Sequence, residues 1–217
     1  MLNIDKALLA KLQKRIIDIS FKHRLAHLGS CLSTLPILIE IYENKKENDI
    51  MVLSNGHAGL ALYVILEHYE NLDAEQLYLK HGVHPKKSDS DKIFCSAGSL
   101  GQGLTVAVGY AIANPDKTVY TLISDGETGE GSIWESLRFV KENEIENIVI
   151  FCNMNGYSAI NKLDLGYLSK CLNTFYPNIV LRYTDAEPFK FLKGLGLEAH
   201  YRIMNEQEYK SALEELL

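Results

Sequence analysis

Two short apolar segments, separated by a helical pattern, constrain the fold of this chain most strongly. Residues 117–123 (KTVYTLI) and 147–152 (NIVIFC) have the length and β-branched content of strands buried on both faces. The segment between them, 131–143, has the pattern of a helix. Because buried strands that alternate with helices build parallel sheets, we predict an α/β fold with a parallel sheet flanked by helices on both faces. The 217 residues suit one domain over 1–217.

Apolar spacing and capping residues predict the other elements. Asp5 is the expected N-cap of the first helix. Ser132 and Glu135 match the pattern of a capping box, and Asp73 begins a similar pattern. The predicted helices cover 5–24, 33–42, 57–69, a stretch from 73, 100–113 and 206–217, the further strands 51–53 and 179–183, a glycine-containing turn 27–30, and loops 45–49 and 81–99.

Charge and composition exclude several classes of protein. The 22 basic and 28 acidic residues give a net charge of −6, which argues against nucleic-acid binding through phosphate groups. With 47% hydrophobic and 23% charged residues, the chain does not have the composition of a disordered protein. No stretch approaches the roughly 18 apolar residues of a membrane span, and no signal-peptide pattern is present. We expect a cytoplasmic protein without a membrane partner, whose Cys31, Cys95, Cys152 and Cys171 are reduced thiols.

Polar residues follow the two buried strands directly. Asp125 follows the first strand, and Asn153 and Asn155 follow the second. Because parallel strands end at the same edge of a sheet, these oxygen donors should converge, as a divalent cation shared with phosphate groups requires. Gly126 and Gly129 would allow a phosphate to approach the backbone. The pattern indicates a metal–diphosphate site, although Asp-Gly alone is also a common turn.

Three histidines, His27, His57 and His84, lie in or just before turn regions. An imidazole can transfer a proton or donate a hydrogen bond to a phosphate, so three in comparable positions favour a functional role. Each one alone is explained as readily by a structural role. The glycine cluster at 98–103 fits neither the G-x-G-x-x-G nor the G-x-x-x-x-G-K-[ST] pattern, so it does not indicate a nucleotide-binding loop of either kind.

Together these motifs resemble the transketolase family of thiamine diphosphate enzymes. Asp125 and Asn155 lie thirty positions apart, as the ends of the thiamine diphosphate signature do. The other similar segments occur in the family's order and are 26–30 (AHLGS), 51–58 (MVLSNGHA), 84–85 (HP), 98–103 (GSLGQG), 130–131 (EG) and 134–136 (WES). They cover about residues 20–160. The resemblance is to the diphosphate-binding (PP-type) half of transketolase, as in its split, two-subunit forms.

The resemblance implies a role for each matching residue at the diphosphate. Asp125 and Asn155 would ligate Mg²⁺ or Ca²⁺ by their side chains, and Tyr157 by its backbone carbonyl. Gly126 would donate its amide to the diphosphate. Glu130 matches a carboxylate at the subunit interface that is linked to the opposite active site.

The resemblance also implies substrate and pyrimidine contacts. His57 matches a histidine near the diphosphate and the donor substrate, and His27 and His84 match histidines that contact the substrate. These three histidines would hold donor hydroxyls and move protons. Gly98 and Leu100 match the backbone that meets the aminopyrimidine of the cofactor.

The chain departs from the family pattern at several positions. Ser124 replaces a glycine, which is acceptable only where the backbone does not need a positive φ. Asn153 stands where the family often has aspartate, and Ser99 replaces a proline. The part after residue 160 matches poorly, and we expect 161–217 to be a shortened C-terminal part of the domain.

The resemblance implies an assembly larger than this chain. In the family a glutamate on a separate pyrimidine-binding domain activates the cofactor, and the chain is too short to contain that domain. We therefore expect a partner subunit in a 2+2 assembly, and transfer of a two-carbon ketol unit from a ketose, usually phosphorylated, to an aldose. Two alternatives stay open. One is another thiamine diphosphate enzyme, similar to 1-deoxyxylulose-5-phosphate synthase or a 2-oxo acid decarboxylase, which should lack the Ser-Asn-Gly-His segment. The other is a non-catalytic relic that binds a partner.

Overall fold

The computed structural model describes residues 4–216 and contains a parallel sheet of four strands. The strands lie in the order β1-β2-β3-β4 and are β1 Ile50–Leu53, β2 Val119–Ser124, β3 Ile148–Met154 and β4 Val180–Tyr183. The register pairs Leu53 with Leu122 and Ser124 with Asn153, so the carboxyl ends of β1, β2 and β3 meet at one edge. The predicted α/β class with a parallel sheet is confirmed.

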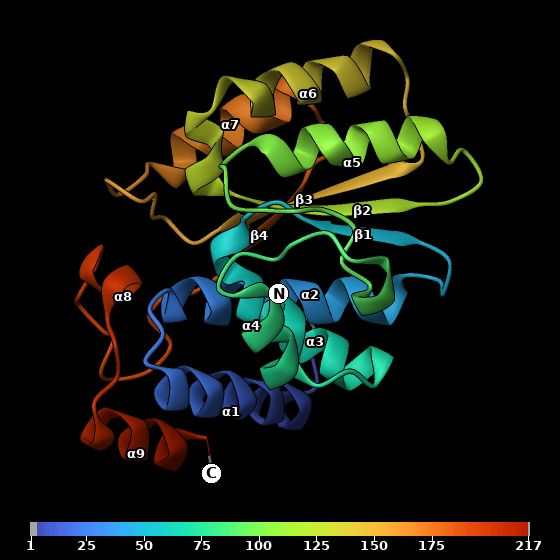
Figure 1. Cartoon of the computed structure of the whole chain (residues 1–217). Helices are drawn as coiled ribbons and strands as arrows, with labels where there is room; N and C mark the ends of the chain where they lie inside the picture. The colour runs from blue at the N-terminus through green and yellow to red at the C-terminus, as the bar shows by residue number, and fades with distance from the viewer. Residues whose placement is uncertain (1–3, 217) are drawn as a thin grey trace.

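Helices cover both faces of the sheet (Figure 1). On one face lie α5 Gln102–Ala113, α6 Gly131–Glu142 and α7 Leu165–Phe175, and on the other α1 Lys6–His23, α2 Leu28–Asn44, α3 Gly59–Glu70 and α4 Ala74–His81. The C-terminal helices are α8 Glu198–Tyr201, which contacts α2, and α9 Glu206–Glu215, which contacts α1. Three short 3-10 helices are η1 Gly56–Ala58, η2 Asp89–Asp91 and η3 Asp125–Gly129.

Side chains that alternate along the strands divide the core into two clusters. Ile50 and Val52 of β1 pack in the cluster that includes residues of α5, α6 and α7. Met51 and Leu53 belong to the cluster that includes residues of α1 to α4. A strand between two layers of helices needs apolar residues on both faces, which explains why these segments are continuously hydrophobic.

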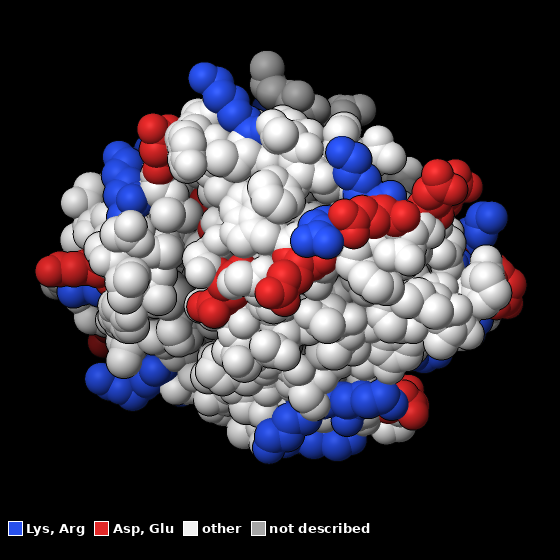
Figure 2. Space-filling view, turned by 90° about the horizontal axis from the view of Figure 1, so that it is seen from above, with Lys and Arg blue, Asp and Glu red and all other residues white. Residues whose placement is uncertain are grey.

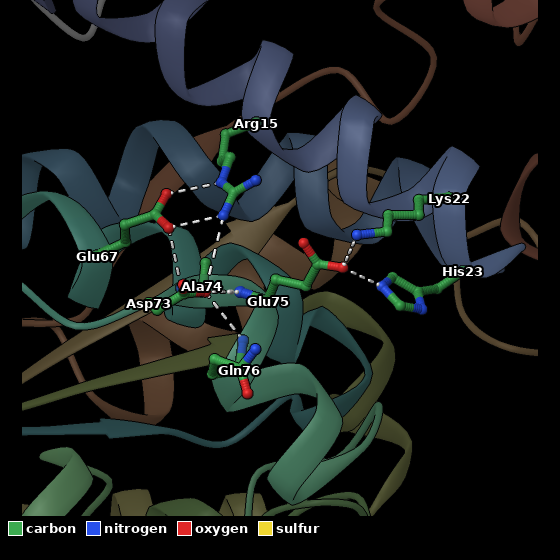
Figure 3. A network of polar contacts seen from close by, with 8 residues as sticks. All are labelled: Arg15, Lys22, His23, Glu67, Asp73, Ala74, Glu75 and Gln76. Atoms are coloured by element: carbon green, nitrogen blue, oxygen red, sulfur yellow. Dashed lines mark hydrogen bonds and ion pairs between the residues drawn. The ribbon is translucent and has the colours of Figure 1, made fainter.

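A polar network joins the first, third and fourth helices (Figure 3). The Arg15 guanidinium donates to both carboxylate oxygens of Glu67, at 2.8 and 2.9 Å. Glu67 also accepts from the amide of Ala74 at the start of α4, at 3.0 Å. Nearby, Glu75 pairs with Lys22 at 2.6 Å. This network lies away from the carboxyl edge of the sheet and orients α1 against α3 and α4.

The predicted turn at 27–30 is wrong, because α2 already begins at Leu28 and not at residue 33. His27 is the N-cap and takes the left-handed conformation itself, with φ of 63°. Gly29 lies inside the helix, where a Cβ would meet the carbonyl oxygen of Ala186 at 2.5 Å. The glycine is therefore needed for close approach of two backbones and not for a turn.

The predicted capping box of Ser132 and Glu135 is also wrong. The N-cap of α6 is Glu130, and no side chain caps it. The Ser132 hydroxyl instead donates to the carbonyl of Gly101 at 3.1 Å. The other short-range predictions at helix starts are confirmed at Asp5 and Asp73, whose side chains accept backbone N–H bonds at the starts of α1 and α4.

Two further segments differ from the prediction. The loop predicted over 81–99 begins with His81, which is buried at the end of α4 and whose Nε2 lies 2.8 Å from Asp91 Oδ2. Helix α7 was not predicted, although Asp164 caps it and leucines at 165, 168 and 172 have helical spacing. The strand at 179–183 and the C-terminal helix are confirmed as β4 and α9.

Charged side chains are scattered over one face of the molecule. On the face seen from above, over α5, α6 and α7, basic and acidic side chains form small separate groups with a broad uncharged area between them (Figure 2). Among residues 4–216, no helix combines the length and apolarity needed to cross a membrane. All four cysteines are free thiols, as predicted.

Candidate active site

The carboxyl ends of β1, β2 and β3 border a cavity. Residues that line it include His57, Leu100, Gly126, Asn155, Tyr157 and His200. They come from η1, from the turn before α5, from the segments that follow β2 and β3, and from α8. Ligands of open parallel sheets bind at this edge, so the cavity lies where the strand ends predicted a site.

Asp125 is a buried carboxylate without a positive partner. It is 0% exposed, and its oxygens accept the amides of Gly126 at 2.9 Å and Gly156 at 2.6 Å. The ion pairs among residues 4–216 do not include it. Burial raises the pKa of the Asp125 carboxyl to about 7, although the backbone amides oppose this shift. Such a group fits a site that a cation completes.

The other predicted metal ligands lie beside Asp125. Asn155 Oδ1 accepts the amide of Tyr157 at 3.0 Å. The Tyr157 carbonyl oxygen faces Gly126, where a Cβ would approach it to 3.3 Å. No cluster of three His, Cys, Asp or Glu ligands exists in the described part of the chain. The gathered set of one carboxylate, one amide and one carbonyl suits a hard cation that phosphate oxygens also ligate, so the residues fit Mg²⁺ or Ca²⁺.

The structure explains two departures from the family pattern. Ser124 has φ of −105°, so its position does not require glycine. Asn153 is buried, and its amide donates to the hydroxyls of Ser33 at 3.0 Å and Thr34 at 3.3 Å, while Thr184 donates to its carbonyl. An ionised aspartate at 153 could not donate to these two hydroxyls, so an asparagine fits this network better.

The three predicted histidines gather around the cavity, and His200 joins them. His27 Nδ1 lies 2.8 Å from His200 Nε2, and the His27 amide donates to the His200 carbonyl, also at 2.8 Å. The His57 ring centre lies 5.4 Å from that of His200 and 5.9 Å from that of His27. His84 is exposed and packs beside Gly98, where a Cβ would meet its ring at 3.3 Å.

Burial keeps these imidazoles neutral. It lowers the pKa of His57 to about 3 and that of His27 to about 4, with repulsion from His200 as the next cause. Burial also lowers the pKa of His200. A neutral imidazole can accept a proton or a hydrogen bond, which a permanently charged one cannot. The cluster can therefore hold hydroxyl groups and take up protons at neutral pH.

The turn at 98–101 closes another side of the cavity. Leu100 lines it, and Gly101 follows with φ of 77°, a left-handed conformation that favours glycine. The Gly101 amide donates to Glu127 at 2.9 Å. Glu130 lies apart from the histidines; it is exposed and lines a second hollow, which shares Leu100 with the cavity.

Comparison with known proteins agrees with this geometry. The sequence model of the family described as 1-deoxy-D-xylulose-5-phosphate synthase matches residues 3–215. One of the two subunits of the apulose-4-phosphate transketolase from Actinobacillus succinogenes is 30% identical over 246 aligned positions, which cover 88% of this chain and 87% of that protein. The chain belongs to the family that contains transketolases and 1-deoxy-D-xylulose-5-phosphate synthases.

Two further comparisons show how much of a family member is present. The 6-deoxy-6-sulfo-D-fructose transketolase subunit SqwG of Clostridium sp. (strain MSTE9) is 33% identical over 164 residues, and the chain spans 60% of its length. The crystal structure of transketolase from Campylobacter jejuni has the same fold, with a TM-score of 0.78 and 22% identity. It covers 99% of this chain, which spans only 43% of that transketolase. This family member therefore matches one part of a transketolase.

Two residues of this transketolase-family site were not predicted from the sequence. His200 lies 173 positions from His27, and no local spacing connects the two. Glu127 is 0% exposed and accepts hydrogen bonds from Ser54 and Gly101 as well as Ser124. Its position two residues after Asp125 was the available signal, but sequence alone did not show that its side chain turns inward.

Proposed function

We propose that this chain is the diphosphate-binding subunit of a two-subunit transketolase that uses thiamine diphosphate and Mg²⁺ or Ca²⁺. The supporting observation is the convergence at one sheet edge of a buried, unpaired Asp125 carboxylate with Asn155 and the Tyr157 carbonyl, beside a cluster of neutral histidines. The reaction would transfer a two-carbon ketol unit from a ketose or ketose phosphate to an aldose.

The metal and diphosphate would lie at the ends of β2 and β3. Asp125, Asn155 and the Tyr157 carbonyl would hold the cation, whose charge the buried carboxylate lacks. The Gly126 amide, which donates to Asp125 in this structure, would turn to the diphosphate. Gly98 and Leu100 would offer backbone to the aminopyrimidine, and the bound cofactor would supply carbanion stabilisation.

The histidines would act on the sugar. His27 and His57 are neutral at pH 7 and face the cavity together with His200. They would bind donor hydroxyls and accept protons. His84 is the most accessible of the predicted histidines and would contact the substrate from the outer side. His200 joins this set because it holds His27 by two contacts.

We also propose a partner protein with a pyrimidine-binding domain, in a 2+2 assembly in the cytoplasm. The chain spans less than two thirds of SqwG, and relatives such as SqwG are named as subunits. Glu130 is exposed beside the second hollow, as a residue that meets a partner would be. The shortened region after 160 belongs to the proposal too, because an alignment of 246 positions with a relative exceeds the 217 residues of this chain.

A second function is formation of 1-deoxyxylulose 5-phosphate, because the matching family model has that synthase's name. Ketol transfer is preferred on the Ser54-Asn55-Gly56-His57 segment, which places His57 in the cavity. The two reactions differ in their products, which chromatography of the reaction mixture separates.

Native purification from the source cells, with identification of bound protein and cofactor, tests the proposal. We expect a stoichiometric partner with a pyrimidine-type domain, bound thiamine diphosphate, and ketol transfer by the purified complex. Recovery of this chain alone and without cofactor would contradict the proposal and favour the non-catalytic relic. A complex that forms only 1-deoxyxylulose 5-phosphate would favour the second function.

A further inference from the structure

The Glu127 carboxylate connects three segments that meet at the cavity. Its Oε1 accepts the Ser54 hydroxyl at 2.6 Å and the Gly101 amide at 2.9 Å. Its Oε2 accepts the Ser124 amide at 2.9 Å, and the Ser124 hydroxyl accepts the Glu127 amide at 3.3 Å. The side chain is 0% exposed, so water cannot replace these donors without a rearrangement.

Each of the three segments bears residues of the proposed site. Ser54 ends β1 and leads into η1, which contains His57. Ser124 ends β2 and directly precedes Asp125. Gly101 closes the 98–101 turn, which the proposed function assigns to the aminopyrimidine.

Glu127 is an expensive residue if stability alone is considered. A buried carboxylate loses hydration, and an apolar core of similar volume is often as stable or more stable. Glu127 has three donors and no ion pair among residues 4–216. Two of those donors are backbone or side-chain groups of separate elements around the cavity, which a simple turn cap would not need.

The turn is fixed to this part of the molecule by few groups. Gly101 has no side chain, and its left-handed backbone lies against Glu130 and Ser132. Its carbonyl accepts from Ser132, and its amide donates to Glu127. Both contacts come from the 125–132 region, so the position of the turn depends on the segment that bears Asp125.

We propose that Glu127 is a positioning residue that fixes the 98–101 turn relative to the Asp125–Gly126 segment, so that the two ends of thiamine diphosphate meet a backbone of set spacing. This inference rests on the proposed function and deepens it. Glu127 itself touches neither the diphosphate nor the pyrimidine. Its loss should therefore weaken binding of the whole cofactor more than binding of a diphosphate alone.

The test compares two ligands on the full chain by calorimetric titration with Mg²⁺: thiamine diphosphate and inorganic diphosphate. Glu127→Gln keeps the size of the side chain but directs an NH₂ group at donors. We expect at least about tenfold weaker binding of thiamine diphosphate, as for loss of hydrogen bonds to a buried charged group. Inorganic diphosphate should change by less than roughly threefold. Asp49→Asn, at another buried carboxylate that accepts two backbone amides, is the matched control and should change neither affinity.

Ser54→Ala keeps the test decisive if Glu127→Gln does not fold. It removes one donor to Glu127 and should weaken thiamine diphosphate selectively, by a smaller factor. Equal weakening of both ligands, or no change of either, in the folded variants would overturn the inference, because Glu127 would then only support the 124–129 segment or nothing at the site. Failure of the wild-type chain to bind either ligand, alone and in the purified native complex, would overturn the proposed function as well.

Discussion

The two edges of the sheet use buried carboxylates in different ways. At the amino edge, Asp49 is 7% exposed and accepts the amides of Lys46 at 2.8 Å and Thr118 at 3.0 Å, which ties the starts of β1 and β2 together. At the carboxyl edge, Asp125 and Glu127 are both fully buried within three residues of each other. Neither has a positive partner in the described part of the chain.

The difference indicates which edge was built for a ligand. One carboxylate with backbone donors suffices to join strands at the amino edge. The carboxyl edge adds a second buried carboxylate, and histidines whose pKa values burial lowers, at a cost in folding free energy. Proteins accept such costs mainly at functional sites, where a bound ion or substrate restores the balance.

The largest expected effect is on Asp125. Asp125→Ala should abolish metal-dependent binding of thiamine diphosphate in the assembled complex, at least about 100-fold, because it removes the only charged ligand proposed for the cation. Calorimetric titration with and without Mg²⁺ measures this. Asp49→Asn should keep full affinity but lose about 1–3 kcal/mol of unfolding free energy. Unchanged affinity of Asp125→Ala would remove the metal assignment.

His84→Ala should lower kcat of ketol transfer by about 10- to 100-fold, since a substrate contact or proton carrier would be lost. Affinity for thiamine diphosphate should stay nearly unchanged, because His84 lies on the outer side of the cavity. His68→Ala, at an exposed histidine of α3, is the control for the assay. Collapse of cofactor binding in His84→Ala would make His84 a cofactor or folding residue instead.

A smaller effect is expected in the pH dependence of stability. The pKa of His57 in the folded chain, about 3, lies below its ordinary value of 6.5. As pH falls through 6.5 the unfolded chain therefore gains a proton that the folded chain does not bind, so the unfolding free energy falls toward pH 4. Between pH 7.5 and pH 5, urea unfolding should show that His57→Gln loses about 1–2 kcal/mol less than wild type. An identical loss in both would refute the assigned burial of His57, and His68→Gln should behave as wild type.

The smallest effect is expected away from both edges, in the network of Figure 3. Arg15→Gln removes a partly exposed pair with Glu67, whose side-chain exposures are 32% and 29%. It should cost about 0.5–1 kcal/mol of unfolding free energy and leave cofactor affinity unchanged. Thermal denaturation and the same titration measure both. A change in affinity as large as that of a carboxyl-edge variant would show that the comparison of the two edges is misplaced.

Much of the fold could be predicted because its signals are local. The buried strands around Val119 and Ile148 and the N-caps Asp5 and Asp73 follow from patterns of a few residues. The errors arose where tertiary contacts decided. Ser132 bonds to Gly101 and not to its own helix start, because the turn before α5 lies against it.

The site could be predicted in part, for the same physical reason. Asp125, Asn155 and His57 lie next to strand ends, whose common edge the parallel topology fixes. His200 and Glu127 could not be predicted, because their contacts join residues far apart in the chain, to His27 and to Ser54. The start of α2 was missed because a non-glycine residue, His27, adopts a left-handed backbone.

The most direct test of the account is a crystal structure of the native complex with thiamine diphosphate and Mn²⁺, a cation visible by anomalous scattering. We predict one anomalous peak between the Asp125 carboxylate, Asn155 Oδ1 and the Tyr157 carbonyl, with the diphosphate on the Gly126 amide. A peak elsewhere, or a diphosphate bound away from the ends of β2 and β3, would contradict the assignment of the carboxyl edge as the cofactor site.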